Sequence, residues 1–360
     1  MSTTRRLIPL TSDTETKPTQ GMREAIARAE VGDEQRGEDP TVNRLQERIA
    51  QLLGKEAALW LPGGTMCNLV AIKVHTAPSD AIVADGMAHI VRAESGGAAL
   101  ICGVQVEAID TARGIFTPEE LRRALNRLKT AAPPYAPPVR LVCVEQTHNF
   151  GGGSVWSVGQ LSAVTEVARA EGLALHMDGA RLLNACVATG VPAANFAALV
   201  DSVWIDFTKG LGAPIGAVLA GSRAFIAEAR RYKHVVGGAM RQAGIAAAGC
   251  LYALDHHVER LVQDHANAHR LAGGLSQIRG IAVSTAKPES NIVFFDVSGI
   301  GLSNEDFLAA LSARGVRMAQ ARGEIRAVTH LDVSQQDIDV AISAIADIAS
   351  AQRVAPARRA

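Results

Sequence analysis

The chain has 360 residues, of which 48% are apolar and 20% are charged, a balance that is ordinary for a soluble globular protein. This length favours one large domain with one smaller domain. The 36 basic and 36 acidic side chains give a formal net charge of zero, which argues against nucleic acid or an anionic membrane surface as the partner and favours a small molecule.

The cysteines and the apolar runs predict the compartment. The five cysteines are an odd number, are scattered, and form no Cys-x-x-Cys pair, so free thiols in a reducing compartment are expected rather than disulfides or a zinc site. The N-terminal MSTTRRLIPLTSDT lacks the apolar centre of a signal peptide. No run approaches the roughly 18 apolar residues of a membrane helix. We therefore expect a cytoplasmic protein with no membrane partner.

Between about residues 55 and 220, short β-rich runs alternate with helical patterns. The helix predicted over 117–130 has Thr117 as its N-cap, Pro118 in its first turn and Glu120 completing a capping box. This alternation predicts an α/β fold with a mostly parallel sheet that is covered on both faces. The predicted strands are 81–84, 98–102, 139–144, 173–177 and 202–207, and a second helix is predicted over 157–171.

After about residue 255 the pattern changes to that of a smaller α+β domain. A long polar helix is predicted over 254–279, and it is followed by a strand at 291–297, a helix at 304–315, a strand at 324–331 and a terminal helix at 334–353. The expected organisation is an N-terminal arm (1–20), a large domain (21–255) and a small domain (256–360).

Two features outside these elements lead to expectations of their own. The long helix carries four histidines, His256, His257, His265 and His269. Pairs of histidines four residues apart could bind a metal. We interpret these histidines instead as part of a solvated helical face and expect no metal site. The Pro-rich stretch 132–138 predicts an exposed loop.

Two polar residues follow predicted strands one strand–helix–strand step apart. Asp178 ends the first strand, where ligands bind in open α/β sheets, and a carboxylate there could keep a pyridine nitrogen protonated. Lys209 follows the second strand and precedes Gly-rich sequence that can bend over a ligand. Alone, Asp178 could cap the next helix and Lys209 could be a surface lysine in a turn. Together they indicate a cofactor site.

A third segment could bind phosphate. Gly63, Gly64 and Thr65 precede a helical run, and the backbone N–H groups at such a helix start bind anions. Thr208 could add a second hydroxyl. An ordinary tight turn is the alternative interpretation of the Gly-Gly-Thr sequence.

Taken together, the segments resemble the L-threonine aldolase family, within the β-eliminating-lyase group of fold-type-I enzymes that use pyridoxal 5'-phosphate (PLP). The resemblance runs in family order over nearly the whole chain. It rests on SDTETKPT (12–19), VGDEQRGEDPTVNRL (31–45), GKEAALWLPGGTMCN (54–68), EQTHN (145–149), LHMDGARLLNA (175–185), TKGLGAPIGAVLAG (208–221), GGAMRQAGIAAAG (237–249) and EIRAVTHLDVS (324–334).

The resemblance implies a transferase-like α/β fold in which a large PLP-binding domain holds a mostly parallel seven-stranded sheet. It also implies a role for each matching residue. Lys209 carries PLP as a Schiff base, Asp178 pairs with the ring nitrogen, and His89 stacks on the ring and is a candidate acid/base. The phosphate is held by Gly64, Thr65 and Thr208, with Arg241 contributed from a neighbouring subunit. The substrate carboxylate is held by Ser12, Arg326 and Arg181, which also lies beside the cofactor, although Arg181 could instead be an ion-pair arginine. His148 and Asn149 follow another predicted strand and are expected to line the pocket, with a structural role in the loop as the alternative.

The chain departs from the family pattern where the β-substituent of the substrate is expected. Thr11 replaces the family's Arg, Arg36 replaces a Tyr, and Thr208 replaces a Ser. A gap-free count places Tyr135 where the family often has a second histidine. With a reference pKa of about 10, a tyrosine is a poor base at neutral pH. We therefore expect the family's reaction on a substrate with a different preferred β-substituent. If Arg36 faces the pocket, it would favour a substrate whose β-substituent is anionic.

The resemblance implies cleavage of the Cα–Cβ bond of L-threonine, L-allo-threonine or a related β-hydroxy-α-amino acid to glycine and an aldehyde. Two alternatives stay open: β-elimination or racemisation on the same cofactor, and a PLP-binding protein without turnover. PLP fixes the electron sink, while the orientation of the substrate decides which bond breaks. The resemblance also implies a homo-oligomer, a dimer or a tetramer, with sites at subunit boundaries.

Overall fold

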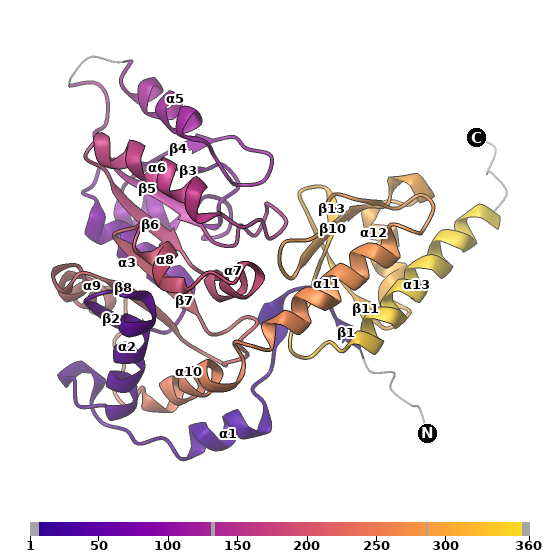
Figure 1. The fold of residues 1–360 in the computed structure, drawn as a ribbon, viewed down its shortest axis with the longest axis horizontal. Helices are drawn as coiled ribbons and strands as arrows, with labels where there is room; N and C mark the ends of the chain where they lie inside the picture. Colours follow the sequence, from indigo (N-terminus) through magenta and orange to yellow (C-terminus); the bar gives the residue numbers. More distant parts are fainter. Residues whose placement is uncertain (1–6, 131–133, 286, 355–360) are drawn as a thin grey trace.

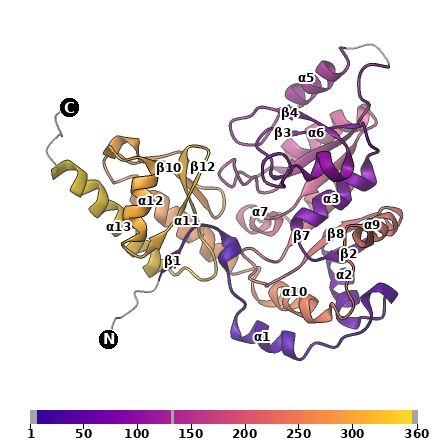
Figure 2. The same ribbon diagram turned by 180° about the vertical axis from the view of Figure 1, so that it is seen from behind.

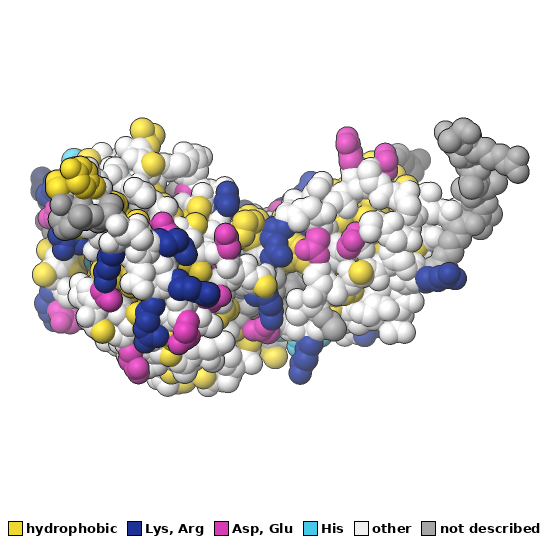
Figure 3. Space-filling model, turned by 90° about the horizontal axis from the view of Figure 1, so that it is seen from above, with side chains coloured by type: hydrophobic (Ala, Val, Ile, Leu, Met, Phe, Trp, Pro, Cys, Tyr) yellow, Lys and Arg dark blue, Asp and Glu magenta, His cyan; other side chains and the backbone are white. Residues whose placement is uncertain are grey.

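The structure is a computed structural model that describes residues 7–130, 134–285 and 287–354. The chain forms a large lobe and a smaller lobe, and the smaller one carries the C-terminus (Figure 1). Side chains of both charge signs are intermixed over the face in Figure 3, in keeping with the neutral composition. Within the described residues, no helix has the length and apolar character needed to cross a membrane.

The large lobe is built on a seven-stranded sheet in the order β2-β8-β7-β6-β5-β3-β4. Strand β8 is antiparallel to both of its neighbours, and the other pairs are parallel. The strands are β2 (Ala57–Leu61), β3 (Ala81–Asp85), β4 (Gln105–Ile109), β5 (Val139–Glu145), β6 (Ala174–Asp178), β7 (Ser202–Asp206) and β8 (Ala217–Gly221).

Helices cover both faces of this sheet, as buried parallel strands require. In β5, Val142 and Val144 face one core while Leu141 and Cys143 face the other. Figures 1 and 2 show α6 and α8 on one face and α3 and α9 on the opposite face. The helices of this lobe are α1 (Gln20–Ala27), α2 (Pro40–Leu53), α3 (Gly64–His75), α4 (His89–Arg92), α5 (Pro118–Leu128), α6 (Val158–Ala170), α7 (Leu182–Thr189), α8 (Ala193–Ala197), α9 (Arg223–Val235) and α10 (Gly244–His256).

The small lobe packs three helices on an antiparallel sheet of order β12-β13-β10-β9. The N-terminal segment also belongs to this lobe, because β1 (Ile8–Pro9) pairs with β11 (Val316–Arg317) and the side chains of Ile8 and Leu10 enter its core. Its other elements are α11 (Leu261–Leu275), β9 (Ala282–Val283), β10 (Ile292–Asp296), α12 (Asn304–Ser312), β12 (Ala319–Ala321), β13 (Glu324–Val328) and α13 (Gln335–Val354).

Two predicted elements were wrong. Residues Ala98–Cys102 form a turn of π-helix rather than a strand. In this segment Ala98 and Cys102 are buried while Leu100 is 81% exposed, which is a helical spacing that an apolar run of five does not reveal. The predicted helix over 254–279 is interrupted, since α10 ends at His256 and α11 begins at Leu261.

The histidines of this segment also differ from the expected solvated face. The side chains of His257 and His265 are buried. His257 Nδ1 lies 2.6 Å from the carbonyl oxygen of Leu211, and His265 Nε2 lies 3.2 Å from Asn184 Nδ2. Leu211 and Asn184 belong to the large lobe, so part of the predicted polar face packs against that lobe.

Candidate active site

A cavity of about 380 Å³ lies at the carboxyl ends of β5, β6 and β7, where the N-terminal segment and the small lobe meet the large lobe. This is the edge at which open α/β sheets bind ligands. The cavity brings together residues that are widely separated in sequence. The predicted site residues that line it are Ser12, Gly64, Thr65, His89, Asn149, Asp178, Arg181, Thr208, Lys209 and Arg326.

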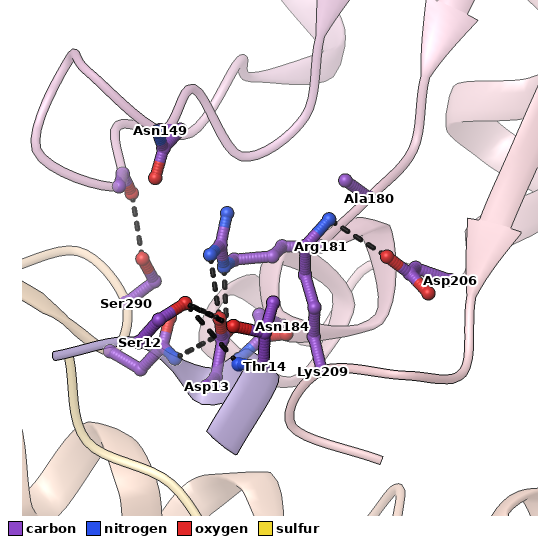
Figure 4. Close-up of polar contacts among 12 residues, drawn as sticks. Ser12, Asp13, Thr14, Asn149, Ala180, Arg181, Asn184, Asp206, Lys209 and Ser290 are labelled. Atoms are coloured by element: carbon purple, nitrogen blue, oxygen red, sulfur yellow. Dashed lines mark hydrogen bonds and ion pairs between the residues drawn. The ribbon is translucent and has the colours of Figure 1, made fainter. Parts of the chain in front are cut away.

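The amine of Lys209 points into the cavity from the loop after β7. Its Nζ lies 2.8 Å from Asp206 Oδ2, and its side chain is 15% exposed (Figure 4). Asp206 ends β7 and accepts two further hydrogen bonds, from the backbone N–H and the hydroxyl of Thr208. The Lys209 backbone is held by Thr16, whose hydroxyl donates to the Lys209 carbonyl. The amine is therefore fixed in position while its outer face stays open to a ligand.

Asp178 is a buried carboxylate that lines the cavity. Its Oδ2 accepts from Asn68 Nδ2 at 2.8 Å, and its Oδ1 accepts from the backbone N–H of Ala180. Burial and the neighbouring Glu145 raise the pKa of Asp178 to about 6, against the opposing effects of Lys209 and His89. A cationic group placed beside this carboxylate would lower that pKa and form a strong pair with it.

His89 is held at the cavity wall by two carboxylates. Its backbone N–H donates to Glu145 Oε2, and its Nδ1 lies 2.9 Å from Oε1 of the buried Glu94. Burial lowers the pKa of His89, but the Glu94 hydrogen bond and the charges of Asp178, Glu94 and Glu145 outweigh it, so the pKa is raised. The imidazole is thus oriented for contact with a ligand and able to hold a proton.

Two arginines lie side by side at the end of the cavity nearest the small lobe. Arg181 donates two hydrogen bonds to the buried Asp13. Arg326, on β13, donates to Asn149 Oδ1 and to the Thr11 carbonyl, while its buried Nε has no hydrogen-bond partner in the part of the chain that the structure describes. Burial and the nearby Arg181 lower the pKa of Arg326 to about 10. Asp13 neutralises one of these two cations, so a ligand carboxylate would neutralise the other.

The N-terminus of α3 also opens into the cavity. No side chain caps this helix, whose N-cap is Gly63. A Cβ on Gly64 would meet the Trp204 ring at 2.2 Å, so glycine allows the helix start to lie against the indole. The first backbone N–H groups of α3, together with the hydroxyls of Thr65 and Thr208, form a site suited to a phosphate.

Four of the predicted site residues do not line the cavity in this chain. Tyr135 is 82% exposed and lies before β5, at the opposite edge of the sheet, because a gap-free count across a Pro-rich loop does not fix its position. His148 is buried behind the cavity wall, where its Nε2 lies 3.2 Å from Asp85 Oδ1. Arg36 and Arg241 are exposed, and both lie within ion-pair distance of Asp33.

Several residues that line the cavity or support its lining residues escaped the predictions, and the sequence contains a signal for only some of them. Four parallel strands of the large sheet end in a carboxylate, and their carboxyl ends meet at the same edge: Asp85, Glu145, Asp178 and Asp206. Predicted strands that each end in an acidic residue would have indicated this cluster. Nothing local to the sequence of Asn68, Glu94 or Asp13 marks them, since their roles come from contacts made across the fold.

Comparisons with known proteins agree with this geometry. A family profile described as beta-eliminating lyase matches residues 9–298. Low-specificity L-threonine aldolase 1 of Arabidopsis thaliana is 39% identical over 343 residues, which cover 94% of this chain and 95% of that protein. The low-specificity L-threonine aldolase of Escherichia coli K12 is 39% identical over 336 residues, covering 92% and 96%. The solved structure of Leishmania major threonine aldolase superimposes with a TM-score of 0.82 at 21% identity, covering 95% and 99%.

Proposed function

This chain belongs to the L-threonine aldolase family of the beta-eliminating lyases, and we propose that it uses PLP to cleave a β-hydroxy-α-amino acid between Cα and Cβ. The products are glycine and an aldehyde, and L-threonine and L-allo-threonine are the first substrates to test. The observation that carries the proposal is a single cavity that holds a fixed lysine amine, a buried carboxylate and a pair of arginines with one cation unmatched.

The residues of the cavity fit PLP group by group. Lys209 offers the amine that would join the aldehyde of PLP. Asp178 offers a buried carboxylate with a raised pKa. A cationic partner, such as a protonated pyridine nitrogen, would stabilise its anion. The uncapped start of α3 offers N–H groups for the phosphate. When bound, PLP supplies an electron sink for the electron pair of the bond that breaks at Cα.

The protein's own residues then decide which bond breaks. Arg326, Arg181 and Ser12 hold the substrate carboxylate, which fixes how the bonds at Cα are oriented. His89 accepts the proton of the β-hydroxyl group, and Glu94 keeps its ring in place. The Lys209 amine would deliver a proton to Cα after the bond has broken. Asp178, as an anion, keeps a proton on the ring nitrogen.

Product analysis tests the reaction type. The protein loaded with PLP is incubated with L-threonine, L-allo-threonine and phenylserine, and the products are quantified. Equimolar glycine and aldehyde are expected. Ammonia and a keto acid would instead establish β-elimination, and change of configuration without cleavage would establish racemisation. A Lys209→Ala variant and a matched surface variant, Lys129→Ala, serve as the negative and positive controls.

The assembly and compartment are part of the proposal. We propose a cytoplasmic homo-oligomer, a dimer or a tetramer. Support comes from exposed apolar side chains on two adjoining segments, Val31 on one and Met240 and Ile245 on the other. These segments are tied together by the Glu34 N–H bond to the Arg241 carbonyl. Light scattering after size-exclusion chromatography tests the assembly, and a monomer at micromolar concentration would contradict it.

A further inference from the structure

A line of buried polar side chains runs beneath α3 and ends at Asp178. Asn68 and His75 lie on the same face of α3, seven residues apart, and they face His176 on β6 and Ser202 on β7. His176 and Ser202 are register partners in the sheet. Asn68, His176 and Ser202 are fully buried, in a layer that is otherwise apolar. Buried polar groups are costly unless they are paired, so this line calls for a role.

The hydrogen bonds fix the orientation of the Asn68 amide. Trp204 Nε1 can only donate, and it lies 2.7 Å from Asn68 Oδ1, which must therefore be the carbonyl oxygen. The NH₂ group of Asn68 then donates to two carboxylates, Asp178 Oδ2 and Glu94 Oε1, each at 2.8 Å. One amide group thus holds the carboxylate of Asp178 and the carboxylate that orients His89.

The same logic sets the direction of the rest of the line. His176 Nε2 lies 3.1 Å from the Asn68 carbonyl oxygen, so this nitrogen carries the proton. His176 Nδ1 then accepts from Ser202 Oγ at 2.9 Å. Because Ser202 donates its only hydroxyl proton to His176, its Oγ must accept from His75 Nε2, which lies 2.8 Å away. Every hydrogen bond in the line donates toward Asn68, and through it toward Asp178 and Glu94.

This direction requires His176 to be neutral, because its Nδ1 accepts a hydrogen bond from Ser202, whereas His75 Nε2 donates to Ser202 in either protonation state. Burial lowers the pKa of His75 to about 4, and burial together with His75 lowers that of His176 to about 3, so both rings are neutral near pH 7. Around Asp178 itself, Glu145 and Glu94 favour the protonated acid, while Lys209 and His89 favour the anion. The hydrogen bond that Asn68 donates also favours the Asp178 anion, although Asn68 itself carries no charge.

We propose that Asn68, supported in turn by His176, Ser202 and His75, is a positioning residue that keeps Asp178 ionised and aimed into the cavity and keeps Glu94 against His89. The proposal rests on the proposed function in one respect, that Asp178 is the partner of the PLP ring nitrogen. It adds that the charge of that partner is set from beneath α3 by a neutral relay, which consists of Asn68, His176, Ser202 and His75 and lies outside the cavity lining.

The test follows the ionisation of Asp178 in the protein without cofactor. Infrared difference spectra against Asp178→Asn isolate the Asp178 carboxylic-acid band, which is titrated in wild type, Asn68→Leu and Ser202→Ala. Loss of a hydrogen bond to a charged group predicts that the midpoint for Asn68→Leu rises by about one pH unit or more. Ser202→Ala leaves the Asn68 donor in place, so its midpoint should rise by a smaller amount. PLP affinity should fall in the same order, by about tenfold for Asn68→Leu.

Thr165→Val is the matched control, because it removes a buried hydroxyl that bonds to Leu161 and lies outside the relay. It should leave the midpoint unchanged. If Asn68→Leu does not fold, His176→Asn and Ser202→Ala make the same comparison. Unchanged midpoints in the folded relay variants would overturn the proposal. Because this titration needs neither PLP nor turnover, a failed aldolase assay with shifted midpoints would refute the proposed reaction alone.

Discussion

Arg181 and Asp13 are joined by two hydrogen bonds, from Nε to Oδ2 and from the terminal NH₂ group to Oδ1, both 2.7 Å long (Figure 4). Both side chains are buried, and Asn291 from the small lobe donates a third hydrogen bond to Asp13. Burial favours the neutral acid, yet the Arg181 guanidinium holds the pKa of Asp13 far below its usual range. The N-terminal segment thereby fixes the position of an arginine in the substrate site.

Replacing Asp13 by Asn should destabilise the protein and weaken substrate binding. Removal of one partner from a buried ion pair costs about 3–5 kcal/mol. Because the pKa of Asp13 is lowered by folding, its stabilising contribution is complete above the unfolded pKa of about 3.9 and is lost as pH falls further. The stability difference between wild type and Asp13→Asn, measured by urea unfolding, should therefore shrink below about pH 4.

Asp339→Asn is the control for this prediction. Asp339 forms a similar two-bond pair with Arg270, but both side chains are exposed at the surface. Because solvent screens an exposed ion pair, its loss should destabilise the protein much less than the loss of Asp13. Equal effects of the two substitutions would contradict a special role for Asp13.

Replacing Arg326 by Ala should raise KM for the amino acid more than it lowers kcat. Its buried Nε has no hydrogen-bond partner among the described residues, and the cavity has one arginine more than Asp13 neutralises. Loss of a charge-assisted hydrogen-bonded contact predicts an increase of about 10- to 100-fold in KM. Steady-state kinetics of Arg326→Ala and of the exposed Arg317→Ala make the comparison. An unchanged KM in Arg326→Ala would place the substrate carboxylate elsewhere.

The pH dependence should report His89. If His89 accepts the β-hydroxyl proton, kcat/KM rises with pH through its pKa, which is raised above the ordinary value of 6.5. Glu94→Gln removes the charged partner of Nδ1, so the acid limb should move to lower pH by about one unit. Glu107→Gln, whose ion pair with Arg127 lies outside the cavity, should leave the limb in place. A shift to higher pH in Glu94→Gln would rule out this assignment.

A second buried ion pair should affect stability rather than chemistry. Lys233 Nζ lies 2.6 Å from Glu34 Oε1, and both side chains are at most 5% exposed. Lys233→Met leaves the Glu34 carboxylate buried without its partner, which predicts a loss of about 3–5 kcal/mol in unfolding free energy. Adding Glu34→Gln should recover part of that loss. Additive losses in the double variant would mean that the two groups are not coupled.

The sequence predicted the alternating α/β pattern and the two strand-end residues because both depend on local chemistry. Thr117, for example, caps α5 with the expected capping box. The three strands β2, β4 and β8 were not singled out, since short apolar runs lack a period of their own. Asp13, Glu94 and Asn68 could not be found from sequence, because most of their partners lie 26 to 278 residues away along the chain. Tyr135 was placed in the site by counting residues along a loop, and the structure places it outside the cavity because such a count does not fix the path of a loop.

Mapping the lysine that holds the cofactor tests the central claim most directly. The protein is incubated with PLP, reduced with borohydride, digested and examined by mass spectrometry. Two other lysines, Lys233 and Lys55, have a pKa lowered by burial and are the natural competitors. We predict one pyridoxyl group per chain, on Lys209, and none in Lys209→Ala. A group on Lys233 or Lys55, or undiminished labelling of Lys209→Ala, would contradict the account.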